Sequence, residues 1–282
     1  MKICVLVLFA ASLCFVCSCK KAPDETATSE QPTTTAAGQG ETTPAEEPEA
    51  MAPAQPAEEE TEEPVAEETE EAEADAEFAA KPGWVPIALE LPKPMFVGTP
   101  QDTKVPNLEK PRGGPRPPFP APEGTVNLAL NKPVSSSDEE PIIGELEMIT
   151  DDDKEAADGS YVELGPFLQH VTIDLEQKAE IFAIICWHYH KQARVYFDVV
   201  VQVADDPDFV TNVQTIFNND IDNSSGLGVG KDKHYTETNE GKLFDCVSMG
   251  VKGRYVRLYS NGNTGNDLNH YIEVAVYGKP AK

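Results

Sequence analysis

The chain has 282 residues, of which 49 are Asp or Glu and 22 are Lys or Arg, so its formal net charge is −27. A chain this acidic, without a basic cluster, is expected to bind nucleic acid poorly, because protein binding to nucleic acid depends on neutralising the phosphates. The acid is concentrated in residues 22–80, which hold 19 Asp and Glu and no Lys or Arg. All eight Tyr lie beyond residue 123, which places the predicted globular part at the C-terminus.

The N-terminus, residues 1–18, is typical of a lipoprotein signal peptide. A lysine precedes the apolar run ICVLVLFAASLCFV, which is too short to span a bilayer comfortably. The run ends in VCSCKK, which resembles a bacterial lipobox and makes Cys19, after the small Ser18, the predicted lipidation site. Plain secretion with cleavage near Ser18 is the alternative. Lys20 and Lys21, rather than an acidic residue, directly follow Cys19, so by resemblance to known sorting rules we expect a lipid-anchored envelope protein at the outer membrane, facing the periplasm or the surface.

Two low-complexity segments follow. Residues 19–80 are rich in Glu, Ala, Thr and Pro, and cannot bury enough apolar surface to offset their ordering entropy, so we expect a disordered acidic linker. Residues 81–124 hold twelve prolines, which forbid a regular helix or a central strand. Their apolar residues, among them Trp84 and Phe96, favour an extended arm that lies on the domain or on a partner. A plain spacer is the alternative.

Residues 125–279 combine short apolar runs with turn signals and show no helical period. In VTIDL, Val171, Ile173 and Leu175 alternate with polar residues, as in a half-buried strand. Clusters of Gly, Asn, Asp and Ser separate the runs. The pattern predicts an all-β sandwich. The expected strands are residues 171–175, 181–190, 195–203, 254–259 and 271–278.

Four of the six cysteines lie within residues 4–19, which leaves Cys186 and Cys246 for the domain. An exported compartment permits a disulfide, but two cysteines do not form a framework. Cys186 stands inside the apolar run IFAIICW, where a free thiol is readily buried. We therefore expect two buried thiols, with a disulfide as the alternative.

Several motifs together resemble discoidin domains, also called coagulation factor five/eight type C domains. They are NLALNKPVSSS (127–137), ITDDD (149–153), LQHVTIDL (168–175), RYVRL (254–258) and EVAVYG (273–278). The resemblance implies a galactose-binding-like jelly roll of antiparallel strands, which binds glycans, phospholipid headgroups or proteins through loops at one end. There are departures. His170 stands where the family usually has Trp, Asp152 replaces a turn Gly, and the terminal cysteine pair of many animal members is absent.

The resemblance also implies a structural calcium ion between the turn after the opening strand and the last strand. The matching positions are Asp151, Asp153 and Ser160, with Glu273 from the final strand. Calcium takes six to eight oxygen ligands, so such a set suits it. An exposed acidic turn is the alternative. A second acidic loop has Asp220 and Asp222 at EF-hand spacing, but it lacks Gly at the sixth place, which excludes an EF-hand.

The expected ligand site combines histidines, an arginine and an Asn-rich loop. Two histidines on one strand face and an arginine after them can rim a loop, and such side chains hydrogen-bond sugar hydroxyls or carboxylates. By resemblance, the loop before the last strand completes the site, although each Asn taken alone is explained by turn geometry. The predicted ligand-binding residues are His188, His190, Arg194, Asn261, Asn263, Asn269, His270 and Tyr271.

The sequence therefore predicts a non-catalytic binding lipoprotein whose ligand is a carbohydrate, and which we expect to be a monomer. No nucleophile elbow, zinc-binding motif or P-loop occurs in it. One alternative is a protein-interaction or structural module of the envelope. Another is a metal-dependent hydrolase that uses His188 and His190, with a third ligand from His234 or His270.

Overall fold

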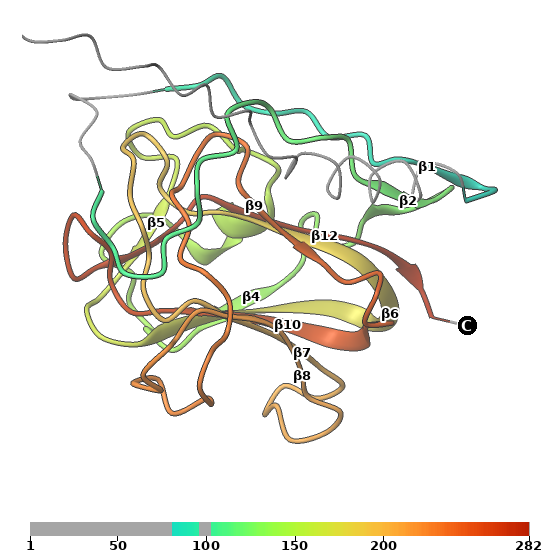
Figure 1. Cartoon of the computed structure of the whole chain (residues 1–282). Helices are drawn as coiled ribbons and strands as arrows, with labels where there is room; N and C mark the ends of the chain where they lie inside the picture. The colour runs from blue at the N-terminus through green and yellow to red at the C-terminus, as the bar shows by residue number, and fades with distance from the viewer. Residues whose placement is uncertain (1–80, 96–102, 282) are drawn as a thin grey trace, which may run out of the picture. The chain divides into compact units, whose positions relative to one another are not determined.

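The computed structural model describes residues 81–95 and 103–281, and its longest strand runs through both layers of a β-sandwich (Figure 1). This strand, β6 (Gln169–Trp187), buries Val171, Ile173 and Leu175 in alternation, as the sequence predicts. It then bends at the exposed residues 176–178, where Glu176 has a positive φ of 63°. Residues 171–175 and 181–187, predicted in separate strands, are therefore one bent strand, and residues 188–190 of the predicted strand 181–190 lie outside it.

The two halves of β6 pair with different neighbours. The first half pairs antiparallel with β4 (Val134–Ser136) and β10 (Lys252–Ser260), and the sheet continues from β10 to β7 (Val200–Ala204) and β8 (Gln214–Asn218). The second half pairs with β9 (Lys242–Asp245) and with β12 (Glu273–Pro280), which in turn pairs with β3 (Val126–Asn127). Residues 195–199 of the predicted strand 195–203 lie outside β7.

The core lies between these layers and consists of inward-facing aliphatic side chains from both. Val201, Val256 and Leu258 from one layer and Val274 and Val276 from the other are fully buried. Cys186 and Cys246 are buried free thiols in the same core. The prediction of two thiols rather than a disulfide is therefore confirmed.

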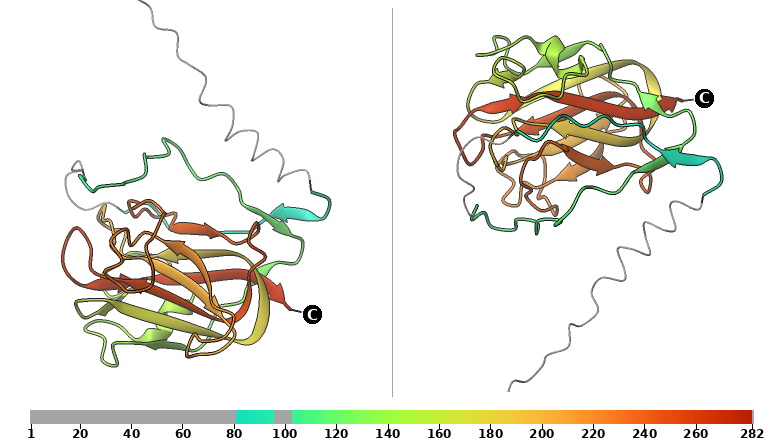
Figure 2. Two further views of the ribbon diagram at one scale, coloured as in Figure 1. Left: turned by 60° about the horizontal axis from the view of Figure 1, so that its bottom comes forward. Right: turned by 90° about the horizontal axis from the view of Figure 1, so that it is seen from above.

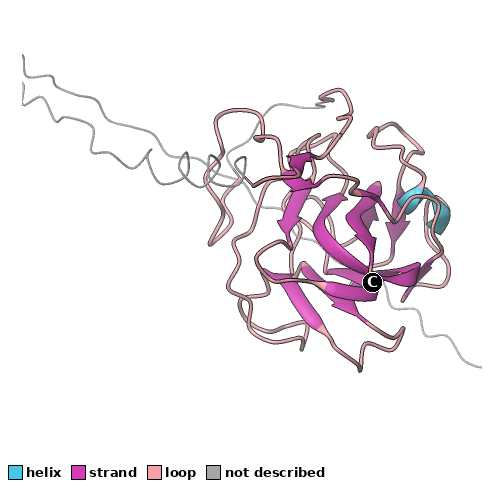
Figure 3. Ribbon diagram, turned by 90° about the vertical axis from the view of Figure 1, so that its right-hand side faces the viewer, coloured by secondary structure: helices cyan, strands magenta, loops and turns pink. Residues whose placement is uncertain are grey.

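A small second sheet lies beside the sandwich. It pairs β5 (Val162–Leu164) with β11 (Asn269–Tyr271), in a register that sets Glu163 opposite His270. A short 3-10 helix, η1 (Leu146–Thr150), precedes it. Figure 3 shows this one turn of helix among strands and loops. The predicted all-β sandwich is confirmed, and in the described residues no helix is long and apolar enough to cross a membrane.

The described parts of the Pro-rich arm, residues 81–95 and 103–124, pack on the sandwich, as one of the two sequence interpretations predicts (Figure 2). Residues 96–102 of the predicted arm lie outside the described residues. The arm begins with β1 (Trp84–Pro86), which pairs antiparallel with β2 (Pro120–Pro122) at its other end. Ile87, Leu89 and Phe119 cover the outer face of the β6–β12 layer, where Ile185, Trp187 and Tyr277 are buried. The arm carries enough apolar surface to exclude water from this face, so it is part of the folded unit.

Hydrogen bonds fix the arm further along. Arg116 donates from Nη1 to the Gly241 carbonyl and from Nη2 to the Glu240 carbonyl, both at 3.0 Å. Leu108 forms a β-bridge with His234. The predicted signal peptide, the lipidation site Cys19 and the acidic linker lie outside the described residues.

Candidate functional site

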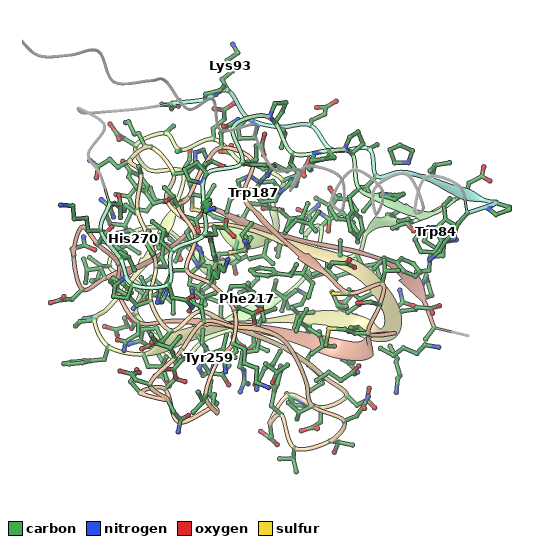
Figure 4. The ribbon with its side chains drawn as sticks, in the orientation of Figure 1. Trp84, Lys93, Trp187, Phe217, Tyr259 and His270 are labelled. Carbon is green, nitrogen blue, oxygen red and sulfur yellow. The ribbon has the colours of Figure 1, made fainter. Side chains whose placement is uncertain are left out.

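The structure corrects the predicted exposed rim. Arg194 and Asn261 are half-buried, whereas the other six predicted ligand-binding side chains are buried. These six are His188, His190, Asn263, Asn269, His270 and Tyr271. Figure 4 shows His270 inside the end of the sandwich opposite Trp84. In this structure these six side chains lie in the protein interior.

His188 continues the inward-facing series of β6. Ile184 and Cys186 face the core, and a period of two places the next position there as well. The His188 ring stacks on Tyr196 with centroids 4.3 Å apart, and its Nδ1 lies 2.6 Å from Oε1 of Glu237. Both partners of this bond are fully buried. The imidazole is therefore a hydrogen-bonded core group and does not reach a ligand at the surface.

His270 forms the centre of a second buried chain of hydrogen bonds. Its Nδ1 lies 3.0 Å from the Tyr196 hydroxyl and its Nε2 lies 3.0 Å from Oε2 of Glu163. Desolvation, and then the charge of Arg194, lowers the pKa of His270 to about 3, so the ring is neutral at neutral pH. The neutral tautomer that satisfies both bonds donates from Nε2 to Glu163 and accepts at Nδ1 from Tyr196.

His190 does not join either of these two groups of hydrogen bonds. Its Nε2 donates to the Lys154 carbonyl at 3.0 Å. Among the described residues, the one group of three candidate metal ligands is Asp198, Asp220 and Asp222, and no histidine belongs to it. The hydrolase alternative therefore has no histidine metal centre in the part of the chain that is described.

The Asn residues of the loop before β12 hold its turns, as the turn-geometry interpretation predicts. Asn263 donates from Nδ2 to Asn266 and to the Leu268 carbonyl. Asn261 donates from Nδ2 to Oδ2 of Asp198 at 2.8 Å. Asn269 accepts at Oδ1 from Ser260 and from the backbone of Gly262.

Asn269 also fixes a residue that sequence reasoning missed. Its Nδ2 donates to the carbonyls of Gly165 and Phe167, at 2.8 and 2.9 Å. Phe167 has a φ of 70°, which is rare for a bulky residue, and its side chain is 79% exposed. The backbone of Gly165 is held from the other side, by Oδ2 of Asp138 at 2.7 Å. The turn signal Gly165-Pro166 was the available clue to this loop.

A second group beside the small sheet was also missed. The rings of Tyr161 and Tyr189 meet edge to face at 5.0 Å, and the guanidinium of Arg194 lies 4.8 Å from the Tyr189 ring centre. Nε and Nη2 of Arg194 both donate to Oε1 of Gln192. Burial, and then the charge of Glu163, raises the pKa of the Tyr161 hydroxyl. Arg194 was predicted, but its aromatic neighbours were not.

The three carboxylates among the four predicted calcium ligands do not form a converging group. Oδ1 of Asp151 accepts the backbone N–H of Asp153, and Oδ1 of Asp153 accepts that of Glu155, so these exposed carboxylates close their own turn. Glu273 is fully buried, and its Oε1 has no hydrogen-bond partner. Desolvation raises the pKa of Glu273 to about 9. The buried oxygen suits a cation, but the carboxylates of Asp151, Asp153 and Glu273 do not come together as a group of three, so they do not fit calcium as a set.

Two further features lie away from the predicted site. The loop whose spacing excludes an EF-hand nevertheless gathers Asp220 and Asp222 beside Asp198, and Ser224 and Ser225 hydrogen-bond there. A hollow of about 290 Å³ lies along β8, lined in part by Phe217 and by the loop that carries Lys231. None of the eight predicted ligand-binding residues lines it.

No protein-family model matches the sequence, and no curated protein matches it. Among solved structures, the chain is similar to the CBM32 of AlyQ in complex with 4,5-unsaturated mannuronic acid (19% identity, TM-score 0.37, covering 51% of this chain and 92% of that one). It is also similar to a fucose-binding module of Streptococcus pneumoniae, SpX-3 (18% identity, TM-score 0.37, covering 54% and 97%).

A family 89 glycoside hydrolase from Clostridium perfringens is similar too, at 18% identity and a TM-score of 0.39. The alignment covers 55% of this chain but only 15% of that enzyme. TM-scores below 0.5 assign no role to any residue, so the roles below rest on this chain's own geometry.

Proposed function

We propose that this chain binds a carbohydrate, without catalysis, at the loop that Phe167 caps. One observation supports this most directly. A large aromatic ring is exposed on a backbone conformation that costs about 1–3 kcal/mol, and Asn269 and Asp138 hold that backbone in place. Burial of this exposed ring contributes almost nothing to stability, so it does not offset the cost of the strained backbone. Such strain is typical of ligand clamps.

The chemistry around Phe167 suits a sugar. The ring offers an apolar face for the apolar face of a pyranose, as aromatic side chains do in ligand sites. Gln169 lies two residues after Phe167, and Ser137 directly precedes Asp138. The Ser137 hydroxyl donates a hydrogen bond to Oε1 of Gln169 at 2.6 Å. These polar groups supply both donors and acceptors for hydroxyls.

The Tyr161, Tyr189 and Arg194 group is the second element of the proposed site. This group lies at the end of β5 opposite to Phe167. Phe167 is hydrogen-bonded to Asn269 of β11, and Tyr161 contacts His270 of β11, so both parts of the site contact the same strand. The predicted residues His270 and Asn269 thus act as positioning residues behind the surface. The Glu237–His188 pair is fully buried and the Glu163–His270 pair nearly so, which keeps both away from a surface ligand and supports a binding role for this end rather than acid–base chemistry.

The location of the protein is also part of the proposal. A lipid on Cys19 would anchor the chain in the cell envelope, at the outer membrane, and the acidic segment that follows would hold the sandwich away from the membrane. The sequence supports this through the lipobox-like VCSCKK and the charge of residues 22–80. Labelling of expressing cells with a palmitate analogue tests it, because a Cys19→Ala variant is expected to lose the label.

A glycan array probed with the full chain tests the binding proposal. We expect saturable binding to one class of sugar, retained in Phe167→Tyr and lost in Phe167→Ala. Val210→Ala is the matched control, because Val210 is equally exposed and lies on a different loop. Binding that is unchanged in Phe167→Ala would contradict the proposed site. A silent array with a folded protein would favour the protein-interaction alternative.

A further inference from the structure

The turn between η1 and β5, residues 151–154, contains a buried positive charge. The Lys154 side chain is only 7% exposed, and its Nζ donates to the carbonyl oxygen of Asp152 at 3.1 Å and also to the Asp152 carboxylate. Lys is almost never buried unless it is paired. This lysine therefore has a specific electrostatic task in the turn.

The opposite side of the turn is held by the final strand. Oε2 of Glu273, the first residue of β12, accepts the backbone N–H of Asp152 at 3.2 Å. Asp152 itself has a φ of 72°, a conformation that an L residue rarely adopts without such support. Asp152 is thus fixed twice, through its oxygens by Lys154 and through its nitrogen by Glu273.

The rest of the Lys154 side chain is fixed as well. Its Nζ lies 5.8 Å from the ring centre of Trp187, a residue labelled in Figure 4, and its carbonyl accepts a hydrogen bond from His190. Lys154 and Glu273 both hydrogen-bond to Asp152, so the ammonium and the carboxyl act on the same residue of the turn. A divalent ion near Glu273 would have to displace this ammonium or bear its repulsion.

We propose that the ammonium of Lys154 supplies, in this chain, the positive charge that the family resemblance assigns to calcium, so that the turn is closed without a metal ion. A lysine ammonium is compact and has three donors, and here two of the oxygens that a metal could use belong to Asp152 and are bonded to Nζ. The Asp151 and Asp153 carboxylates are consequently free to close their own turn. This inference is independent of the proposed sugar site.

Thermal unfolding of the full chain tests the inference. We expect the same Tm with excess calcium chloride as with excess chelator. Lys154→Met keeps the side-chain length and removes the charge, and is expected to lower the Tm by several degrees. Lys191→Met is the control, because Lys191 has a comparable bond to an exposed carboxylate, that of Asp158. A higher Tm in calcium that persists in Asp220→Asn, or a Lys154→Met variant as stable as the control, would overturn the inference.

Calorimetric titration of the wild type with calcium chloride alone is a second test, which does not depend on whether Lys154→Met folds. We expect no binding heat from this turn. Should heat appear, Asp220→Asn and Glu273→Gln locate its source. Heat that is lost only in Asp220→Asn comes from the acidic loop and upholds the inference, whereas heat that is lost in Glu273→Gln places calcium at the turn and overturns it.

Discussion

The side chain of Asn269 holds the backbone of Phe167, with Nδ2 donating to the Phe167 carbonyl at 2.9 Å. Asn269 is fully buried and Phe167 is 79% exposed. A buried amide thus fixes the conformation of an aromatic ring at the surface. The sequence pointed to the positioning residue, and the structure adds the residue that it presents.

Phe167→Gly is expected to separate stability from binding. Glycine adopts a positive φ without strain, so the free energy of unfolding should be about 1 kcal/mol higher in the variant than in the wild type. This gain remains although glycine has more conformational freedom in the unfolded chain. Sugar binding should be lost with the ring. Urea unfolding of the full chain measures the first effect and the glycan array the second. A variant that is less stable than the wild type would show that Phe167 supports the fold.

Asn269→Ala is expected to be among the more costly single changes at this end. It removes the hydrogen-bond partner of the Gly165 carbonyl, the Phe167 carbonyl and the Gly262 amide, and each buried polar group left unsatisfied costs about 1–3 kcal/mol. Urea unfolding should show the loss. Asn266→Ala, in the exposed part of the neighbouring loop, should cost less than half as much. Equal losses in the two variants would contradict the assigned role.

Acid is expected to destabilise the fold through the buried histidines. The pKa of His270 falls from 6.5 to about 3 on folding, chiefly because burial disfavours the charged ring. The unfolded chain therefore binds the proton first, so stability is complete above pH 6.5 and decreases as the pH falls toward 3. One such group contributes about 1.4 kcal/mol per pH unit in that window.

Urea midpoints measured across this pH range test the assignment. Burial also lowers the pKa of His170, to about 4, which acts in the same direction. His270→Gln cannot take up the proton, so its stability should depend less steeply on pH than that of the wild type. Identical slopes would contradict the buried neutral state of His270.

Arg116 is expected to hold the arm more strongly than Arg112. Arg116 donates to two backbone carbonyls in a partly buried setting, whereas Arg112 makes one exposed ion pair with Glu240. Arg116→Ala should cost about 2 kcal/mol and Arg112→Ala less than about 1 kcal/mol. Trp84 reports the state of the arm, because its ring contacts Phe182 on β6. Equal effects on stability and on Trp84 fluorescence would contradict this hierarchy.

The two domain cysteines are expected to stay unreactive in the native state. Both are buried, and burial raises the pKa of Cys246 to about 12 and that of Cys186 well above its ordinary value. Peptide mapping after alkylation should show both labelled only when denaturant is present. A disulfide-linked peptide containing both cysteines would contradict the structure.

The sequence predicted the fold well because the relevant signals are local. Alternation in VTIDL placed Val171, Ile173 and Leu175 on the core side, and the β-branched runs marked the other strands. The same alternation, carried forward from Ile184 and Cys186, would have placed His188 inside. Its chemistry was instead interpreted as that of a surface ligand, although a polar side chain with a buried partner such as Glu237 is stable in a core.

The positive φ and the exposed side chain of Phe167 could not be predicted from local sequence patterns. Its exposure depends on a hydrogen bond from Asn269, 102 residues further along the chain. The role of Lys154 depends likewise on Glu273 of the final strand approaching the turn. Neither contact leaves a periodic or short-range signal, so only the packed structure brings these residues together.

The central claim is that a sugar binds at Phe167. The most direct test labels the phenylalanines of the full chain with fluorine, assigns the Phe167 resonance by its absence in Phe167→Tyr, and titrates the best array ligand. We predict that the Phe167 resonance shifts and saturates, while the resonance of Phe217, beside the β8 hollow, stays in place. A shift at Phe217 with none at Phe167 would contradict the account.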